Sequence, residues 1–293
     1  MILDKINEPK DLKKLNEEEL NTLAGEMREP IVKKVNVTGG HIAPNLGIIE
    51  TTIAMHYVFD MPKDKVVFDV SHQCYPHKIL TGRKRGFIEP LDINISGYTN
   101  PKESEHDMFA IGHCSTSVSL ACGLAKARDL KGENYNVIAL IGDGSFSGGE
   151  ALEGFNNGAV LNSNFIIILN DNEMSIAENE GGLYKNLELL RNTNGMAENN
   201  IFKAIGYDYL YVEDGNNVEK MIEALNKVKD TNHPTVVHIH TLKGKGFEPA
   251  IQNKEKFHWI CPGFLNEKPQ KEVESYESVT KDFIMNKKEE YLN

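Results

Sequence analysis

One stretch of the sequence decides the fold: IGDGSFSGGEALEGFNNGAVLNSNFIIILNDNEMS, residues 141–175. It holds the end of one apolar run, NVIALIGDG at 136–144, and all of a second, NFIIILNDN at 164–172. Near-continuous apolar runs of this kind are typical of strands buried on both faces of a parallel sheet. Both runs stop at small or oxygen-bearing residues. Because ligands in open α/β sheets bind beyond the carboxyl ends of the strands, the pattern predicts a ligand site there.

Strand and helix patterns alternate along the rest of the chain. A β-branched run at 66–70 ends just before His72, and TVVHIHTLKGKGF at 235–247 supplies another strand with a glycine-rich exit. A helical face precedes that strand: Val218, Met221, Ile222, Leu225 and Val228. The alternation predicts an α/β fold, a doubly wound and mainly parallel sheet with helices on both faces.

Local signals predict two helix boundaries. The helix that begins near Asp11 is expected to be interrupted at Pro30, because proline lacks the amide hydrogen that a helix interior needs. The segment from Ser147 to Glu150 has capping-box spacing, which predicts a helix that starts directly after the intervening glycines. Backbone amides at such a start would face an anion such as a diphosphate.

Composition narrows the class of protein. The chain has 293 residues, of which 40% are hydrophobic, and a formal net charge of −11. This length is ample for a core. The acidic balance argues against a nucleic-acid partner, because phosphate backbones are bound mainly through clustered Lys and Arg. Neither a membrane span nor a signal-peptide region is recognisable, so we expect no membrane association and a cytoplasmic location.

The cysteines predict neither a metal site nor a disulfide framework. The chain has four of them: Cys74, Cys114, Cys122 and Cys261. No pair has Cys-x-x-Cys spacing, and none lies in a His-rich ligand pattern. We therefore interpret them as thiols of a reducing compartment.

Asp143 and Asn172 form the main candidate site, since each follows one of the two buried strands. A carboxylate, an amide oxygen and a nearby main-chain carbonyl make a hard oxygen set suited to Mg²⁺, which phosphate oxygens and water would complete. A single carboxylate fits a diphosphate ligand, whose own negative charge more acidic side chains would repel. The alternative is that both motifs are ordinary turns. Their joint occurrence on two buried strands favours the site.

Histidines also gather where strands or glycines end. His41, His72, His77 and His113 lie at such positions, which favours phosphate contact or proton transfer. They do not form a His-Glu-x-x-His pattern, so we predict no zinc site. The remaining histidines near helices and strands are expected to be structural: His56, His233, His238 and His240.

These motifs resemble a known family. The Gly142-Asp143-Gly144 and Asn170-Asp171-Asn172 pair is similar to the thiamine diphosphate-binding motif of the transketolase superfamily. More narrowly, five segments resemble 1-deoxy-D-xylulose-5-phosphate synthases: GGHIAPNLG, HYVFDMPKDKVVFDVSHQCYPHKILTGR, GHCSTSVS, NDNEMSIAEN and TLKGKGFEPA. The resemblance implies a thiamine diphosphate-binding fold. It also implies a cofactor-diphosphate domain over 1–263, and a linker with the first helix of a second, absent domain over 264–293.

Carried over position by position, the resemblance implies a set of site residues. Asp143 and the side chain of Asn172 would hold Mg²⁺ together with the main-chain oxygen of Met174. His41 and His258 match active-site histidines near the reacting carbon. The residues implied to bind thiamine diphosphate are His72, Gly112, His113, Cys114, Asp143, Gly144, Ser145, Asn172, Lys243 and Phe247.

The implied activity is a transferase reaction. The family condenses pyruvate with D-glyceraldehyde 3-phosphate to 1-deoxy-D-xylulose 5-phosphate and releases CO₂, which feeds isoprenoid, thiamine and pyridoxal synthesis. The resemblance also implies a homodimer. The family's second domain carries further catalytic and phosphate-holding residues that this sequence lacks. We therefore predict that the chain is inactive alone and needs the missing pyrimidine-binding and C-terminal domains.

The sequence differs from the family pattern at several positions, and two other functions are compatible with it. Cys114 stands where the family has serine, Phe247 where tyrosine is common, and Asn216 where histidine is usual. The stretch after NDNEMSIAEN is also shorter, which puts the loop over the active site in question. Two alternatives are the N-terminal subunit of a split transketolase, which would move a ketol unit between sugar phosphates, and a non-catalytic binding subunit.

Overall fold

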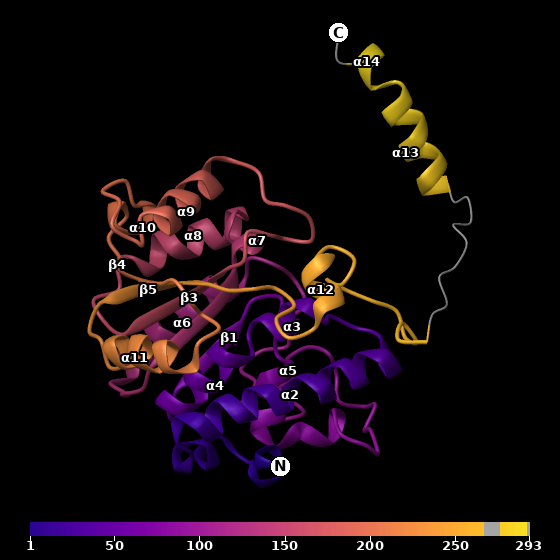
Figure 1. The fold of residues 1–293 in the computed structure, drawn as a ribbon. Coiled ribbons are helices and arrows are strands. Elements are labelled where there is room, and N and C mark those ends of the chain that lie inside the picture. The colour runs from indigo at the N-terminus through magenta and orange to yellow at the C-terminus, as the bar shows by residue number, and fades with distance from the viewer. Residues whose placement is uncertain (267–275, 292–293) are drawn as a thin grey trace. The chain divides into compact units, whose positions relative to one another are not determined.

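The computed structural model describes residues 1–266 and 276–291. The chain divides into two compact units, Met1–Pro262 and Gly263–Asn293. The first unit contains the sheet and every buried residue of the described part of the chain. The elements are labelled in Figure 1.

The sheet of the first unit has five strands, all parallel, in the order β1-β2-β3-β5-β4. Their bounds are β1 (Lys65–Phe68), β2 (Val137–Gly142), β3 (Phe165–Asp171), β4 (Asp208–Val212) and β5 (Pro234–His240). The predicted parallel α/β sheet is thus confirmed. Strand β4 was not predicted. It lies at the sheet edge and is only partly buried, so its sequence DYLYV lacks the continuous apolar run of β2 and β3.

Helices cover both faces of the sheet (Figure 1). On one face pack α6 (Ser117–Lys131), α8 (Gly149–Gly158), α9 (Gly182–Asn192) and α10 (Ile201–Ala204). On the other lie α2 (Glu17–Thr38), α4 (Ile49–Val58) and α11 (Val218–Val228), with α4 packed against both α2 and α11. The other elements of this unit are shorter: α1 (Ile2–Lys5), η1 (Pro9–Lys14), α3 (Ala43–Gly47), α5 (Tyr75–Lys78), η2 (Ile79–Arg83), η3 (Lys84–Gly86), α7 (Asp143–Phe146) and α12 (Glu248–Gln252).

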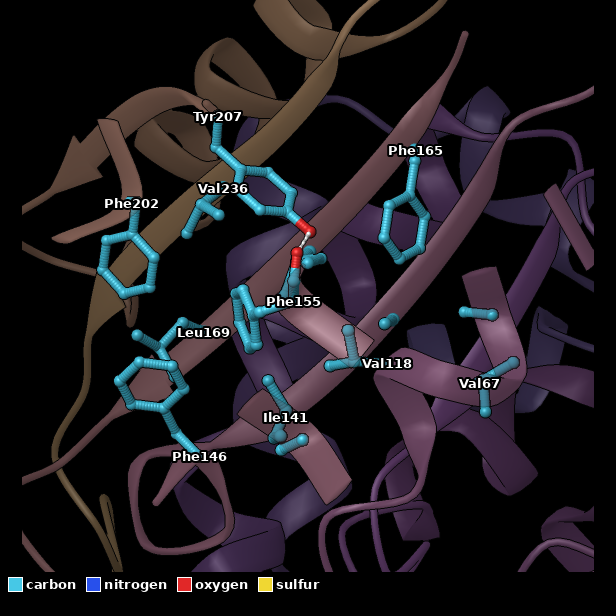
Figure 2. Close-up of a cluster of buried hydrophobic side chains, with 14 of the residues drawn as sticks. Val67, Val118, Ile141, Phe146, Phe155, Phe165, Leu169, Phe202, Tyr207 and Val236 are labelled. Carbon is cyan, nitrogen blue, oxygen red and sulfur yellow. Dashed lines mark hydrogen bonds between the residues drawn. The ribbon is translucent and has the colours of Figure 1, made fainter. Parts of the chain in front are cut away.

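An aromatic cluster fills the space between the sheet and α8 to α10 (Figure 2). The ring centroids of Phe146 and Phe155 lie 5.0 Å apart, and those of Phe146 and Phe202 lie 5.4 Å apart. The Tyr207 hydroxyl donates a 2.7 Å hydrogen bond to the main-chain oxygen of Phe155, so its polar end is satisfied. This packing anchors the carboxyl ends of β2 and β3, where the candidate site lies.

Two helix predictions were wrong. Helix α2 runs without interruption through Pro30, with its first turn capped by Asn16. Its buried residues Met27, Ile31 and Val35 keep one apolar face against the core, so tertiary packing outweighs the lost hydrogen bond. Helix α8 begins at Gly149, the second of the two glycines and one residue earlier than predicted, and it lacks the predicted capping box. The Ser147 hydroxyl instead donates to the main-chain oxygen of Gly144.

The second unit contains α13 (Tyr276–Asn286) and α14 (Lys288–Tyr291). The sequence predicted one helix over 278–291, and a helix is present there with a break near residue 287. Part of the predicted linker, residues 267–275, lies outside the described residues. No helix in the described part of the chain is long and apolar enough to cross a membrane.

Candidate active site at the strand ends

A cavity of about 330 Å³ opens beyond the carboxyl ends of the strands. Residues that follow four of them meet there: His72 after β1, Asp143 after β2, Asn172 after β3 and Lys243 after β5. Parallel strands deliver their ends to the same edge of a sheet, which brings together residues far apart in sequence. Further lining residues come from the adjoining loops: His41, Pro44, Val70, Gln73, Cys114, Gly142, Gly144, Ser145, Met174, Ser175, Ile176 and His258.

Asp143 is held in place by hydrogen bonds from three groups. Its Oδ1 accepts from the amide of Gly144 at 2.9 Å, and its Oδ2 accepts from the amide of Asn172 at 3.3 Å and from Nδ2 of Asn179 at 2.8 Å. A side chain at Gly144 would lie 2.7 Å from Cβ of Ser175, so only glycine fits there. The bonds fix the carboxylate between the ends of β2 and β3.

The pKa values of two neighbouring carboxyl groups, Asp143 and Asp171, are shifted in opposite directions. Burial raises the pKa of Asp143 well above its ordinary value, and the nearby Asp171 carboxylate adds to this effect. Burial also tends to raise the pKa of Asp171. The interactions with His238 and Arg191 outweigh burial and hold this pKa below its ordinary value. A cation beside Asp143 would stabilise its charged form.

Other oxygen atoms beside Asp143 are available as metal ligands. The Oδ1 of Asn172 is buried and has no hydrogen-bond partner among the described residues. Met174 pairs with Glu178 in an isolated bridge whose hydrogen bonds are made by flanking residues, so the bridge leaves the Met174 carbonyl unused. In the described part of the chain, no group of three or more His, Cys, Asp or Glu residues could hold a metal. The oxygen set here contains one carboxylate, an amide and a main-chain carbonyl.

Three imidazoles cluster in the same cavity. The ring centroids of His41 and His72 are 4.8 Å apart, those of His41 and His258 are 5.4 Å apart, and those of His72 and His258 are 5.5 Å apart. Burial lowers the pKa of His41 to about 4 and that of His258 to about 3, and it also lowers the pKa of His72. All three rings are therefore neutral near pH 7 and able to accept a proton.

Lys243 supplies a buried positive charge. Its Nζ donates a 2.6 Å hydrogen bond to the main-chain oxygen of Ser175, which joins the exit of β5 to the loop after β3. Burial lowers the pKa of Lys243 to about 8, although Asp143 opposes that shift. The ammonium is thus placed to neutralise an anion in the cavity.

Comparison with known proteins identifies the family. The profile described as 1-deoxy-D-xylulose-5-phosphate synthase, N-terminal part, matches residues 3–199 and 192–241. The chain belongs to the 1-deoxy-D-xylulose-5-phosphate synthase family. It is 44% identical to the synthase of Caldanaerobacter subterraneus subsp. tengcongensis, over 89% of this chain and 48% of that protein. It is 43% identical to the synthase of Dictyoglomus turgidum, over 95% of this chain and 51% of that protein. The chain spans about half the length of these relatives.

Solved structures support the fold. Transketolase from Campylobacter jejuni superposes with a TM-score of 0.62 at 20% identity, over 84% of this chain and 41% of that one. Transketolase from Leishmania mexicana gives 0.60 at 18% identity, over 91% of this chain and 44% of that one. At these identities the likeness concerns the fold alone, and it confirms the predicted thiamine diphosphate-binding type of α/β architecture.

Most of the residues implied by the family resemblance meet in the cavity, but three do not line it. Gly112 and His113 are exposed in the loop before α6, where Nδ1 of His113 lies 3.1 Å from the main-chain oxygen of Cys114. Phe247 precedes α12, and its ring packs against Phe257 at 5.7 Å. Their proposed part in cofactor binding stays a prediction.

Not every histidine near a strand end belongs to the site. His77 lies outside the cavity, in a buried network with His56 at 2.9 Å and Asp107 at 2.9 Å. His238, which was expected to be structural, bonds to Asp171 at 2.9 Å and so reaches the site only indirectly.

Sequence reasoning missed several residues that shape the cavity. Gln73 lines it, and its Oε1 accepts a 2.9 Å hydrogen bond from Asn170, whose Oδ1 accepts from Thr241 at 2.6 Å. Asn45 bonds to the main chain of both His41 and His72. In the sequence, Gln73 and Asn45 are recognisable only as polar residues near apolar ones. That pattern does not predict which groups they bond to.

Proposed function

We propose that this chain binds thiamine diphosphate with Mg²⁺ and forms the cofactor-diphosphate part of a 1-deoxy-D-xylulose-5-phosphate synthase. The whole enzyme would condense pyruvate with D-glyceraldehyde 3-phosphate and release CO₂. The observation that carries the proposal is the meeting of an oxygen ligand set, a buried lysine and three neutral imidazoles in one cavity. The sequence identity to the family's synthases supports the same reaction.

The residues present fit a magnesium diphosphate. Asp143, Asn172 and the carbonyl of Met174 would hold the ion. The strongest support is the buried Oδ1 of Asn172, which has no hydrogen-bond partner among the described residues. Lys243 would neutralise charge on the diphosphate. A cation at this position would also stabilise the charged form of the buried Asp143 carboxylate.

We propose that the histidines transfer protons to and from the substrate. When bound, the cofactor supplies the carbanion chemistry. His41 and His258 are neutral and lie edge to face with ring centroids 5.4 Å apart, so either ring offers a nitrogen that can accept a proton from a substrate hydroxyl.

Turnover would require more than this chain. Since these residues span about half the length of each relative, we propose that turnover needs the other half as well, supplied on the same or on a separate polypeptide. A homodimer and a cytoplasmic location stay predictions from the sequence. Combining the chain with that other half should yield CO₂ release from pyruvate, whereas a split transketolase would instead consume a ketose phosphate.

Calorimetric titration of thiamine diphosphate into the purified chain tests cofactor binding. We expect binding that requires Mg²⁺ and that weakens at least about tenfold in Asp143→Ala, because a metal ligand is lost. Asp208→Ala, a change at an exposed aspartate of β4, serves as the control and should bind like the parent chain. Equal binding by both variants would contradict the metal site, whereas no binding by the folded parent chain would favour a non-catalytic subunit that has lost the cofactor.

A further inference from the structure

A second cavity adjoins the first. It has a volume of about 230 Å³ and shares His41 with the main cavity. Lys34 and Thr38, on the last turns of α2, form one side, while Tyr98 and Trp259 contribute aromatic rings. The ring of Tyr98 lies 6.0 Å from that of His41, centroid to centroid. We refer to this cavity as the Lys34 pocket.

Lys34 carries a buried charge without an anionic partner. Lys34 is 3% exposed, and its Nζ donates a 3.3 Å hydrogen bond to the main-chain oxygen of Ile95 and lies 5.1 Å from the ring centroid of Phe87. Within residues 1–266 and 276–291, no carboxylate comes within salt-bridge distance of it. Lys78, an equally buried lysine, instead pairs with Glu103 at 2.6 Å. Buried charges are normally paired with an opposite charge, whereas the Lys34 ammonium has a carbonyl oxygen and an aromatic ring, but no carboxylate, as its partners among the described residues.

The lining of the pocket suits an anion. No aspartate or glutamate is among the described residues that form it, although the chain as a whole carries a net charge of −11. Burial lowers the pKa of Lys34, and Lys78 acts in the same direction, whereas the more distant carboxylates of Glu103 and Asp92 oppose the shift without reversing it. A bound anion would reverse that shift because it stabilises the charged ammonium.

We propose that the Lys34 pocket binds the anionic end of a small oxyanion substrate, a carboxylate or a phosphate, and so holds the rest of the molecule against His41. The identity of the substrate rests on the proposed function, but the anion site does not. Lys34 pairs with the oxyanion, Tyr98 and Trp259 flank it, and the connected cavity receives the reactive carbon. Lys34 is thus a substrate-positioning residue.

Trp259 provides a direct readout, because it is the only tryptophan of the chain and lines the pocket. Inorganic phosphate, glyceraldehyde 3-phosphate and pyruvate are titrated separately into the full chain without cofactor, while tryptophan fluorescence is recorded. We expect a saturable change with at least one of them, weakened at least tenfold in Lys34→Met. Lys33→Met removes an exposed lysine from the next position of α2 and should leave the affinity unchanged.

Stability gives an independent test of the same variant. Replacing a buried, unpaired charge by an apolar side chain of similar length is neutral or stabilising. We therefore expect the thermal unfolding midpoint of Lys34→Met to equal or exceed that of the parent chain. A lower midpoint together with unchanged oxyanion affinity would mean that Lys34 is structural, and would overturn the proposal.

A further variant avoids any change in the core. Ile93 lines the pocket but is 69% exposed, so Ile93→Glu should fold normally and place a negative charge at the pocket. We expect it to weaken oxyanion binding, whereas Ile93→Gln should not. A response to pyruvate alone would assign the carboxylate, and a response to both phosphate compounds would assign the phosphate. No fluorescence change with any of the three would refute the site, whatever the calorimetric result for thiamine diphosphate.

Discussion

At the scale of single residues, Asn45 organises the imidazole cluster although it does not line the cavity. Its Nδ2 donates to the main-chain oxygens of His41 and His72, each at 2.7 Å, and its Oδ1 accepts from the amide of Tyr75 at 2.9 Å. One fully buried amide therefore fixes the spacing of two histidines that are 31 positions apart, 72 minus 41.

We expect Asn45→Ala to lower the free energy of unfolding by about 2–4 kcal/mol, because it leaves buried main-chain groups without partners. Urea denaturation followed by circular dichroism measures this. Asn21→Ala, at an exposed position of α2, should change the free energy by less than about 0.5 kcal/mol. A similar small effect at Asn45 would show that water replaces its hydrogen bonds.

The neutral imidazoles predict that stability falls in acid. The pKa of His258 is lowered to about 3 from an ordinary value of 6.5, so between these values the unfolded chain binds a proton that the folded chain does not. Stability is therefore lost as the pH falls through 6.5 toward 3. His258 should contribute up to about 2 kcal/mol to the loss between pH 7 and pH 5.

Urea denaturation at pH 7 and pH 5 checks this prediction. In His258→Asn, the difference in the free energy of unfolding between pH 7 and pH 5 should be smaller by that amount. His233→Asn removes a histidine whose side chain is 42% exposed, and it should leave the difference unchanged. An unaltered difference in His258→Asn would mean that the His258 ring is not kept neutral by burial.

At the scale of elements, the loops at the strand ends carry the backbone strain. Val70 and Ser71 after β1, Ser115 before α6 and Glu173 after β3 all have positive φ, at 56°, 65°, 71° and 66°. Non-glycine residues seldom adopt this region, and they persist there only where surrounding contacts hold them. Asp69, at the end of β1, provides such contacts by accepting from the amides of Ser115 at 2.8 Å and Ser117 at 2.9 Å.

We expect Asp69→Ala to destabilise the fold by about 2–5 kcal/mol, because two buried amides lose their acceptor. Amide hydrogen exchange at Ser115 and Ser117 should become faster as the loop that carries Cys114 loosens. Asp208→Ala again serves as the control, with an expected change within about 0.5 kcal/mol. Unchanged exchange at both amides would contradict the role of Asp69 in holding this loop in place.

At the scale of the whole molecule, the core belongs to one unit. All buried apolar residues of the described chain fall between Leu3 and Ile260, and no described residue from Gly263 onward is buried. Within the second unit, Phe283, Ile284 and Met285 on α13 are each more than half exposed. The sheet and the candidate site are thus built by Met1–Pro262.

A chain that comprises only residues 1–262 should therefore fold with a free energy of unfolding within about 1 kcal/mol of the full chain, as is usual for changes outside the core. Urea denaturation of both chains measures the difference. Magnesium-dependent thiamine diphosphate binding should also survive the deletion. A much larger loss of stability would show that residues 263–293 support the core.

Local sequence was enough to identify the main strands and to predict which of their residues lie together at the strand ends. The apolar runs of β2 and β3 are buried along nearly their whole length, so hydrophobicity alone marks them. Their polar ends then place Asp143 and Asn172 at one edge of a parallel sheet. Strand β4 escaped this reasoning because an edge strand is only partly buried and has no such pattern.

Tertiary structure decided what lies next to those strands. Pro30 stays within α2 because core contacts outweigh local propensity, and Asn45 acts through partners that no short-range pattern specifies. The exposure of Lys34 and Lys33 differs because one side of α2 faces the protein and the other faces solvent. Adjacent residues of the same type thus acquire different chemistry, since burial and pairing depend on contacts between distant segments of the chain.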